Sequence, residues 1–475
     1  MRVCNPRTGE QDYEIAPLNE DAIGGLAADL RTQQLDWKQL SPTARGARLD
    51  ALADAIERHK AAIATALIID TGRAAISGIE VDGTIRLIRR WAARAPELLL
   101  EQAQAGANRP TAIPGISTST NLVPYALVGV ISPWNFPLTL ALIDAIPALA
   151  AGCAVMVKPS EITPRFIALL MAALAEVPDV PLAVIEGDGA TGAALVNSAD
   201  YIAFTGSVAT GRKVAMAAAQ AFIPVSLELG GKDPMIVLAS ADPVQAAEIA
   251  LRSSVLNSGQ ACQSIERVYV ARAIAAPFLA ALTEKAQAVR LNYPDINSGD
   301  IGPFIFAKQA QIVAAQLADA VEKGATVIAG GQIEALGGGQ YLRPTVLTEV
   351  TPEMAVMREE TFGPVIPVTV YDTLDEAITL ANSGVFGLSA AVLAATTEEA
   401  ATVAIRLDVG AVSINDGALT SMVWEAEKSA FKASGLGASR MGDSGMLRFL
   451  RKQAIITQSG PPMPLVAYAE DAKHG

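Results

Sequence analysis

Histidine is almost absent from this sequence, because only His59 and His474 occur among its 475 residues. Metal sites built from several histidines are therefore excluded, and a cysteine–histidine hydrolase would have few candidates for its base. Cysteine is nearly as rare, and Cys4, Cys153 and Cys262 lie far apart along the chain. Three scattered cysteines form no disulfide framework, and they favour a reducing compartment such as the cytoplasm.

Positive charge is also in short supply. The 36 lysines and arginines face 49 aspartates and glutamates, which gives a formal net charge of −13. Because an acidic protein lacks the electrostatic footprint of a nucleic-acid binder, we expect neither nucleic acid nor a membrane as a partner. Hydrophobic residues make up 51% of the chain and charged residues 18%, a composition that excludes intrinsic disorder and suits a large core.

One apolar stretch has the length of a membrane span. Residues 138–157 contain a single acidic residue, Asp144, and Pro147 and Gly152 also interrupt the stretch. The segment VKPSE (157–161) that follows is typical of the end of a strand. We therefore predict a buried helix that runs into a central strand, and not a membrane span.

Short apolar runs alternate with helix-like segments over residues 126–240. The runs are 126–131, 154–157, 182–185, 201–204, 223–227 and 235–238. This alternation predicts a parallel, doubly wound α/β sheet, which would bind ligands beyond the carboxyl ends of its strands. Residues 241–415 repeat the alternation less regularly and predict a second α/β domain.

Cys262 is the strongest candidate nucleophile. It lies in the segment NSGQACQS, where Gly259 and Ala261 let a substrate approach the backbone closely. A thiolate attacks a carbonyl carbon well when the pKa of the thiol is lowered. Composition alone leaves a buried structural cysteine as the alternative, and this is how we interpret Cys153.

Two further side chains could act with such a nucleophile. Glu228 lies in SLELGGKDP after an apolar run, where it could act as a general base or remain a surface glutamate. Asn135 lies in PWNFP, where two prolines fix the turn. Its amide could donate a hydrogen bond to a developing oxyanion, or it could cap the helix that follows Pro137.

Three stretches could bind a nucleotide, although each could also be a plain strand-to-helix turn. GDGATG (187–192) matches G-x-G-x-x-G, but no acidic residue stands about 20 positions further on, so the match is incomplete. FTGSVATGR places Gly206 and Ser207 at a helix N-terminus, which suits a pyrophosphate. KPSE places Lys158 and Glu161 after a strand, where a carboxylate could bind both ribose hydroxyls and would repel a 2′-phosphate.

Taken together, seven segments resemble the NAD(P)-dependent aldehyde dehydrogenase superfamily. They are CNPRTGE (4–10), PWNFP (133–137), KPSE (158–161), FTGSVATG (204–211), LELGGKDP (227–234), GQAC (259–262) and EETFGPV (359–365). They occur in the order of the family, and the resemblance covers nearly the whole chain. It implies a Rossmann-like doubly wound cofactor domain, an α/β catalytic domain and a small β oligomerisation element.

The resemblance also implies boundaries for these parts. The NAD-binding domain would comprise 1–108 and 125–228, and the catalytic domain 229–428. Residues 109–124 and 429–475 would supply an oligomerisation hairpin and a C-terminal segment. A homodimer or homotetramer is therefore expected.

Each matching residue receives a role from the resemblance. Cys262 would be the nucleophile and Glu228 the general base, and Asn135 with the backbone amide of Cys262 would form the oxyanion hole. Glu360 would hold the nicotinamide ribose, and Phe362 would border the nicotinamide. The implied cofactor contacts are Trp134, Lys158, Ser160, Glu161, Gly206, Ser207, Gly211, Glu360 and Phe362. NAD is the expected cofactor, with NADP as the alternative, and no metal is implied.

The implied reaction oxidises an aldehyde to a carboxylic acid. A cysteine thiohemiacetal becomes a thioester, which a glutamate-activated water hydrolyses. The alternatives are a CoA-acylating dehydrogenase, a non-catalytic NAD-binding descendant and a cysteine hydrolase. The presence of Glu228 argues against the first, intact Cys262 and Asn135 argue against the second, and the scarcity of histidine argues against the third.

The sequence departs from the family pattern near the C-terminus. Residues 427–442 read EKSAFKASGLGASRMG, where the family commonly has PFGG-x-K-x-S-G-x-G-R-E. An aromatic residue that usually borders the substrate is missing, and Ser439 or Arg440 stands where an acid is usual. These changes leave the identity of the aldehyde open.

Overall fold

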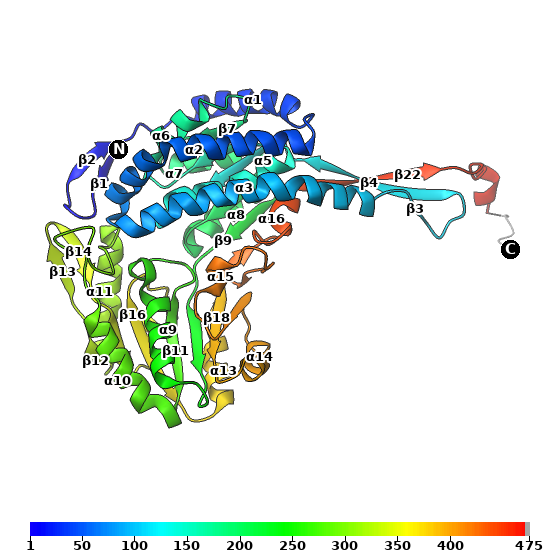
Figure 1. The fold of residues 1–475 in the computed structure, drawn as a ribbon. Helices are drawn as coiled ribbons and strands as arrows, with labels where there is room; N and C mark the ends of the chain where they lie inside the picture. Colours follow the sequence, from blue (N-terminus) through cyan, green and yellow to red (C-terminus); the bar gives the residue numbers. More distant parts are fainter. Residues whose placement is uncertain (471–475) are drawn as a thin grey trace.

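The computed structural model describes residues 1–470, which form two α/β bodies and a projecting arm (Figure 1). The first body contains a six-stranded sheet of order β21-β9-β8-β5-β6-β7. Its strands are β5 (Leu127–Ile131), β6 (Ala154–Lys158), β7 (Leu182–Val184), β8 (Tyr201–Thr205), β9 (Val225–Glu228) and β21 (Gly435–Leu436). All neighbours are parallel except β21, which runs antiparallel to β9.

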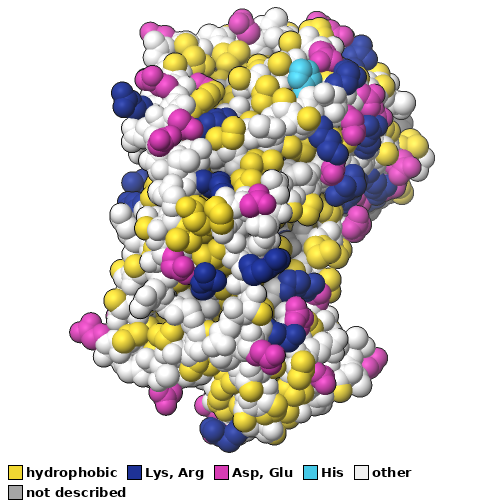
Figure 2. Space-filling view, turned by 60° about the vertical axis from the view of Figure 1, so that its left-hand side comes forward, with side chains coloured by type: hydrophobic (Ala, Val, Ile, Leu, Met, Phe, Trp, Pro, Cys, Tyr) yellow, Lys and Arg dark blue, Asp and Glu magenta, His cyan; other side chains and the backbone are white. Residues whose placement is uncertain are grey.

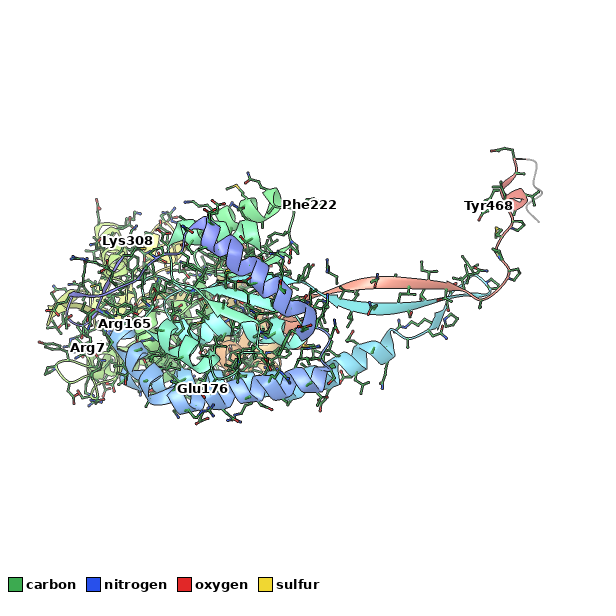
Figure 3. The ribbon with its side chains drawn as sticks, turned by 90° about the horizontal axis from the view of Figure 1, so that it is seen from above. Arg7, Arg165, Glu176, Phe222, Lys308 and Tyr468 are labelled. Atoms are coloured by element: carbon green, nitrogen blue, oxygen red, sulfur yellow. The ribbon has the colours of Figure 1, made fainter. Side chains whose placement is uncertain are left out.

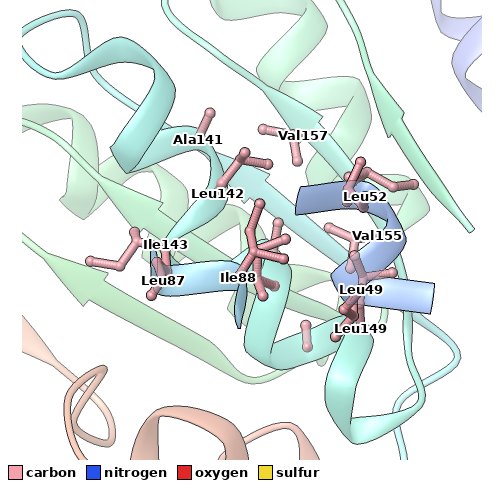
Figure 4. Packing of buried hydrophobic residues seen from close by; sticks show 14 of the residues in the cluster. Leu49, Leu52, Leu87, Ile88, Ala141, Leu142, Ile143, Leu149, Val155 and Val157 are labelled. Atoms are coloured by element: carbon pink, nitrogen blue, oxygen red, sulfur yellow. The ribbon is translucent and has the colours of Figure 1, made fainter. Parts of the chain in front are cut away.

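Helices cover both faces of this sheet. They are α1 (Glu20–Trp37), α2 (Pro42–Thr71), α3 (Ala74–Ala105), α4 (Pro137–Leu142), α5 (Ala145–Ala151), α6 (Phe166–Leu174), α7 (Gly189–Ser198) and α8 (Val208–Gln220). Figure 4 shows how α2 and α3 pack on the strands, with Leu49, Leu52 and Ile88 against Val155 and Val157. All five side chains are fully buried, so the hydrophobic effect holds the long helices against the sheet.

The second body contains a seven-stranded sheet of order β12-β15-β16-β11-β10-β18-β19. Its strands are β10 (Asp233–Val237), β11 (Ile265–Ala271), β12 (Thr326–Ala329), β15 (Thr345–Thr348), β16 (Val365–Tyr371), β18 (Ser389–Leu393) and β19 (Ala411–Ile414). Its helices are α9 (Pro243–Val255), α10 (Arg272–Ala288), α11 (Ala307–Glu322), α12 (Ala355–Arg358), α13 (Leu374–Asn382) and α14 (Thr397–Ala404). Only β12 pairs antiparallel, with β15, so the predicted doubly wound α/β architecture is confirmed.

The arm is a three-stranded sheet of order β22-β4-β3. Its strands are β3 (Arg109–Pro110), β4 (Ile116–Pro124) and β22 (Leu450–Gln458). Every residue of β22 pairs with β4, from Leu450 opposite Pro124 to Gln458 opposite Ile116. Figure 3 shows the arm standing away from both bodies, with Tyr468 near its tip.

Smaller elements complete the described chain. They are β1 (Arg2–Cys4), β2 (Gln11–Glu14), η1 (Leu256–Gly259), β13 (Ile333–Leu336), β14 (Gly339–Leu342), β17 (Phe386–Gly387), α15 (Leu419–Met422), β20 (Phe431–Lys432), α16 (Ser444–Leu447) and η2 (Leu465–Tyr468). Basic and acidic side chains are interspersed on the face in Figure 2, and do not gather there into one basic patch.

The prediction for residues 138–157, a buried helix that runs into a central strand, is correct for the strand, β6, but the buried helix is divided in two. The structure has two short helices, α4 and α5, which are separated at Asp144. Asp144 is fully buried, and its carboxylate accepts hydrogen bonds from Arg440 and Arg448. Pro147 explains the interruption, because it has no N–H to donate to the carbonyl of Ile143, four residues earlier, and its ring clashes with that carbonyl. Within residues 1–470, no helix has both the length and the apolar character needed to cross a membrane.

Candidate active site

A cavity of about 710 Å³ opens where the carboxyl ends of the six-stranded sheet meet the second body. The chain passes from β5 through β6 to β7 on one side of β5, and then through β8 to β9 on the other. The order of the strands therefore reverses between β5 and β8, which is where doubly wound sheets bind their ligands.

Every predicted site residue except Gly211 lines this cavity. Those that line it are Trp134, Asn135, Lys158, Ser160, Glu161, Gly206, Ser207, Glu228, Cys262, Glu360 and Phe362. Gly211 is buried in α8, where a Cβ would lie 2.5 Å from Leu229 Cδ2. Its glycine lets α8 pack against Leu229, so its expected contact with the cofactor is not supported. Gly189 and Gly192 also line the cavity, so both glycine-containing turns reach the same space.

Lys158 and Glu161 form an ion pair at one end of the cavity. The distance between Lys158 Nζ and Glu161 Oε2 is 2.9 Å, and only 6% of the lysine side chain is exposed. Ser207 is the N-cap of α8, since its hydroxyl accepts a hydrogen bond from the backbone N–H of Thr210 at 3.3 Å. A helix N-terminus beside a lysine suits an anionic group such as a phosphate.

Asn135 is held rigidly beside the cysteine loop. Its side-chain Nδ2 donates to the backbone carbonyl of Gln260 at 3.0 Å. Its own carbonyl accepts hydrogen bonds from Arg73 Nη2 at 3.0 Å and from Asn257 Nδ2 at 3.2 Å. Asn135 does not cap α4, because the Glu80 carboxylate accepts the N–H groups of the first turn. The helix-cap alternative for Asn135 is therefore wrong.

The loop before Cys262 has an unusual backbone. Asn257 and Ser258 adopt left-handed conformations with φ of 58° and 55°, and Gly259 follows with φ of 69°. A Cβ on Gly259 would lie 2.3 Å from the carbonyl of Gly363, so only glycine fits there. Two successive left-handed residues that are not glycine, Asn257 and Ser258, store backbone strain, which is typical of functional sites.

The environment of the Cys262 thiol opposes its ionisation. Burial raises the pKa of the Cys262 thiol to about 11, and the charge of Glu360 adds to this effect. Lys428 is the positive charge that lowers this pKa most, followed by Arg440. Both cations lie in segment 427–442, where the sequence departs from the family pattern.

Glu228 ends β9 and lies between the two bodies. Its side chain is 17% exposed, and its Oε1 lies 4.0 Å from Nε of Arg440. Ser439, the other residue predicted to replace the usual acid, is buried, and its hydroxyl accepts a hydrogen bond from the backbone N–H of Lys428 at 3.1 Å. Of the two, the structure therefore brings Arg440 to the predicted base.

Glu360 lies against the glycine pair that follows Glu228. Its carboxylate accepts a hydrogen bond from the N–H of Gly231 at 3.2 Å, and a Cβ on Gly230 would lie 2.5 Å from Glu360 Oε2. Burial, together with the neighbouring charge of Glu266, raises the pKa of Glu360 to about 8. The glycine pair thus provides the space that this carboxylate occupies.

Sequence reasoning missed several polar residues of the cavity, among them Lys213 and Gln309. Lys213 and Gln309 both line it, the first from α8 and the second from α11. Gln309 Nε2 donates to the carbonyl of Thr361 at 2.7 Å, which ties α11 to the segment that carries Glu360 and Phe362. Neither residue lies in a recognisable motif, so a tertiary structure was needed to find them.

His59 is not among the residues that line the cavity. His59 lies on α2, and its Nε2 is 2.7 Å from Glu176 Oε1, while His474 lies outside the described residues. Within residues 1–470, no group of three or more histidine, cysteine, aspartate or glutamate side chains could hold a metal ion.

The family model for aldehyde dehydrogenases matches residues 1–455. The chain belongs to the aldehyde dehydrogenase family. The expected class of enzyme, an aldehyde dehydrogenase that uses NAD or NADP, is thereby confirmed. The expected doubly wound fold is that of the solved structures of this family.

Individual relatives resemble the chain over most of its length. A structure from Anabaena variabilis named "Putative Aldehyde Dehydrogenase" has a TM-score of 0.95 and 49% identity, covering 98% of this chain and 99% of that one. Betaine aldehyde dehydrogenase from Staphylococcus aureus, solved in complex with NAD+, has a TM-score of 0.90 and 29% identity, covering 98% of this chain and 92% of that one. A Mycolicibacterium smegmatis protein named "Putative succinate-semialdehyde dehydrogenase" with NADP(+) is 38% identical, covering 95% of this chain and 87% of its own.

Proposed function

We propose that this aldehyde dehydrogenase works through Cys262 as nucleophile, Glu228 as general base and Asn135 as oxyanion donor. One observation carries the proposal. These three side chains come from different segments of the chain, yet they line a single cavity together with the predicted cofactor contacts. Nucleophile, base and donor around one cavity are the parts that acyl chemistry on a thiol requires.

The donor set of the cavity fits a nicotinamide dinucleotide. The N-terminus of α8, with Ser207 as its N-cap, would hold the pyrophosphate. The carboxylate of Glu161, steadied by Lys158, would accept hydrogen bonds from the adenosine ribose, and Glu360 from the nicotinamide ribose. Phe362 would border the nicotinamide and packs edge-on against Trp134, with ring centroids 5.4 Å apart. When bound, NAD(P)+ supplies the acceptor for the hydride.

The residues of the chain then act in turn. The Cys262 thiolate forms a C–S bond with the aldehyde carbonyl carbon, and the Nδ2 amide of Asn135 and the backbone N–H of Cys262 stabilise the resulting alkoxide. Loss of hydride from that carbon leaves a thioester on Cys262. Glu228 takes a proton from water as the water oxygen attacks, the C–S bond breaks, and the carboxylic acid leaves.

We also propose that the chain forms a homodimer or homotetramer through the arm. Ile456 on β22 is 69% exposed, and Leu465 and Val466 beyond it are 86% and 72% exposed. Apolar side chains exposed along an open sheet edge favour pairing with another copy of the chain. The three cysteines are all free, which fits the predicted cytoplasmic location.

The decisive experiment measures NADH or NADPH formation at 340 nm. The aldehyde panel contains succinate semialdehyde and betaine aldehyde, for which two of the relatives above are named. It also contains lactaldehyde and a polyene aldehyde, because further relatives are named as a lactaldehyde dehydrogenase from Escherichia coli and a 4,4'-diapolycopene aldehyde oxidase from Methylomonas. A signal that needs no CoA and disappears in Cys262→Ala, but not in the matched control Cys4→Ala, would support the proposal. A signal that requires CoA would instead favour the acylating alternative.

A further inference from the structure

A buried chain of charges leads from the interior of the first body to Glu228. Asp144, which precedes α5, is bound by both Arg440 and Arg448, and Arg440 Nη2 lies 2.7 Å from Asp144 Oδ2. Burial alone would raise the pKa of Asp144, but the two guanidinium groups outweigh it and hold the pKa below its ordinary value. One carboxylate therefore stands between two cations, which leaves one positive charge unbalanced.

The unbalanced charge faces the predicted base. Arg440 donates through Nη2 to Asp144 and to the hydroxyl of Thr205, which orients its guanidinium plane. Its Nε is buried and has no hydrogen-bond partner within residues 1–470. This same Nε lies 4.0 Å from Glu228 Oε1. A buried N–H without a partner is costly, so its closeness to a carboxylate calls for an explanation.

The backbone reinforces this arrangement. Strand β21 pairs antiparallel with β9, and Gly435 stands opposite Glu228. The N–H of Leu229 donates to the carbonyl of Ser434 at 2.9 Å. The segment that carries Arg440 is thus fixed to the strand that carries Glu228, on both sides of the glutamate.

We propose that Arg440 is a positioning residue that holds the Glu228 carboxylate, through its Nε–H, where it can accept a proton from the water that hydrolyses the thioester. This inference rests on the proposed function of Glu228. It assigns a task to a residue in the segment where the chain departs from the family pattern. The task concerns hydrolysis alone, because hydride transfer from the thiohemiacetal does not need the base to be held.

The test separates the two half-reactions in Arg440→Gln. In rapid mixing of the enzyme with NAD and aldehyde, we expect a burst of about one NADH per site that slows only slightly, because loss of the Arg440 charge also raises the pKa of the Cys262 thiol. The steady state that follows should be roughly tenfold slower or more. Hydroxylamine should restore turnover in this variant, since its nitrogen attacks the thioester directly, the thiolate leaves and a hydroxamate forms. Arg440→Lys keeps the positive charge near Asp144, so its steady-state rate should fall less than that of Arg440→Gln.

Arg448→Lys is the matched control. It changes the other arginine on Asp144 but none of the groups next to Glu228, so its steady state should stay close to that of the unaltered enzyme. A burst that slows in parallel with the steady state in Arg440→Gln would overturn the proposal, as would an equal loss in Arg448→Lys. If the unaltered enzyme forms no NADH with any aldehyde, the proposed function itself fails.

Discussion

The two sides of Cys262 are built in different ways. On the cofactor side, the lining residues follow directly from the ends of β5, β6 and β8, which regular hydrogen bonding holds in register. On the opposite side lies segment 427–442, which contains only the two-residue strands β20 and β21 and is otherwise irregular. Regular strands thus position the predicted cofactor contacts. The irregular segment 427–442 positions the cations near the Cys262 thiol and the predicted base, Glu228.

The charged groups on the two sides also differ. Glu161, paired to Lys158, lines the cofactor side together with Lys213 and with Glu360, whose carboxyl is largely protonated at pH 7. Lys428 and Arg440 act on the thiol from the other side. Both cations would therefore favour a carbonyl that becomes an anionic adduct on Cys262. The comparison teaches that cofactor binding and thiol chemistry can be altered separately, and the following predictions test this separation.

The largest effect is expected from Glu228→Gln. Loss of a general base costs about 100-fold or more, so steady-state turnover should fall by this amount while a thioester accumulates on Cys262. Mass spectrometry of the quenched enzyme would detect the acyl adduct. Glu161→Gln, on the cofactor side, is the control, and no thioester should accumulate on Cys262 in this variant. Unchanged turnover in Glu228→Gln would refute its role as base.

A smaller effect is expected from Lys428→Met. Lys428 is held by a hydrogen bond from its Nζ to the carbonyl of Thr420 at 2.7 Å, and it is the strongest charge that lowers the thiol pKa. Without it, the pKa of Cys262 should rise above about 11, so less thiolate exists at any pH below that value.

Iodoacetamide alkylation measured from pH 7 to 10 checks this prediction. The rate should rise with pH in both proteins and be about tenfold slower in Lys428→Met, the equivalent of one pKa unit. Lys432→Met is the matched control, because Lys432 lies on the same segment but pairs with Asp408 at 3.1 Å. Equal alkylation profiles in the Lys428 variant and the unaltered protein would contradict the prediction.

A more modest change is expected for the choice between NAD and NADP. Glu161 would repel a 2′-phosphate, and its substitution by glutamine also frees Lys158 from the ion pair. The ratio of kcat/KM for NADP over NAD should rise about fivefold in Glu161→Gln, equivalent to roughly 1 kcal/mol. Steady-state kinetics with both cofactors measures this ratio. A ratio that does not move would remove Glu161 as the selector.

The smallest effect is expected from Glu360→Gln near neutral pH. With a pKa of about 8, the Glu360 carboxyl is largely protonated at pH 7, and glutamine resembles that form. NAD affinity should therefore match that of the unaltered protein at pH 7. Above pH 8 the unaltered carboxyl becomes an anion and a better acceptor for ribose hydroxyls, so its affinity should rise while that of the variant stays level. Fluorescence titration of NAD across this range would show whether the two curves separate.

Local pattern explains why the predicted cofactor contacts come together in one cavity. Lys158, Glu161 and Ser207 each follow a short apolar run, and parallel strands bring such positions to one edge of a sheet. The domain boundaries and residue roles stay predictions. Long-range contacts could not be predicted from the sequence. Nothing in the residues near Arg440 indicates that this side chain lies close to Asp144 or Glu228.

Other regular elements, among them α3 and β15, were not predicted from the sequence, for a different reason. The helix α3 contains Gly78, Gly83 and Pro96, which lower helix propensity, and its packing against α2 compensates for this. The strand β15 has only four residues, and its burial between β12 and β16 makes it a strand. In both cases packing against other elements determines the local structure, and such packing cannot be predicted from local patterns in a single sequence.

The pairing of β21 with β9 has a consequence for the order in which the molecule folds. All other strands of the six-stranded sheet precede residue 229, but its edge beside Glu228 is completed by Gly435 and Leu436. During synthesis, strands β5 to β9 would leave the ribosome long before β21 does. The edge strand β9 of the first body would therefore stay unpaired on its outer side until residues 435 and 436 have been made. A chain that stops short of residue 435 would keep every predicted catalytic residue and still lack the strand beside its base. Activity should therefore appear only after nearly the whole chain has been made.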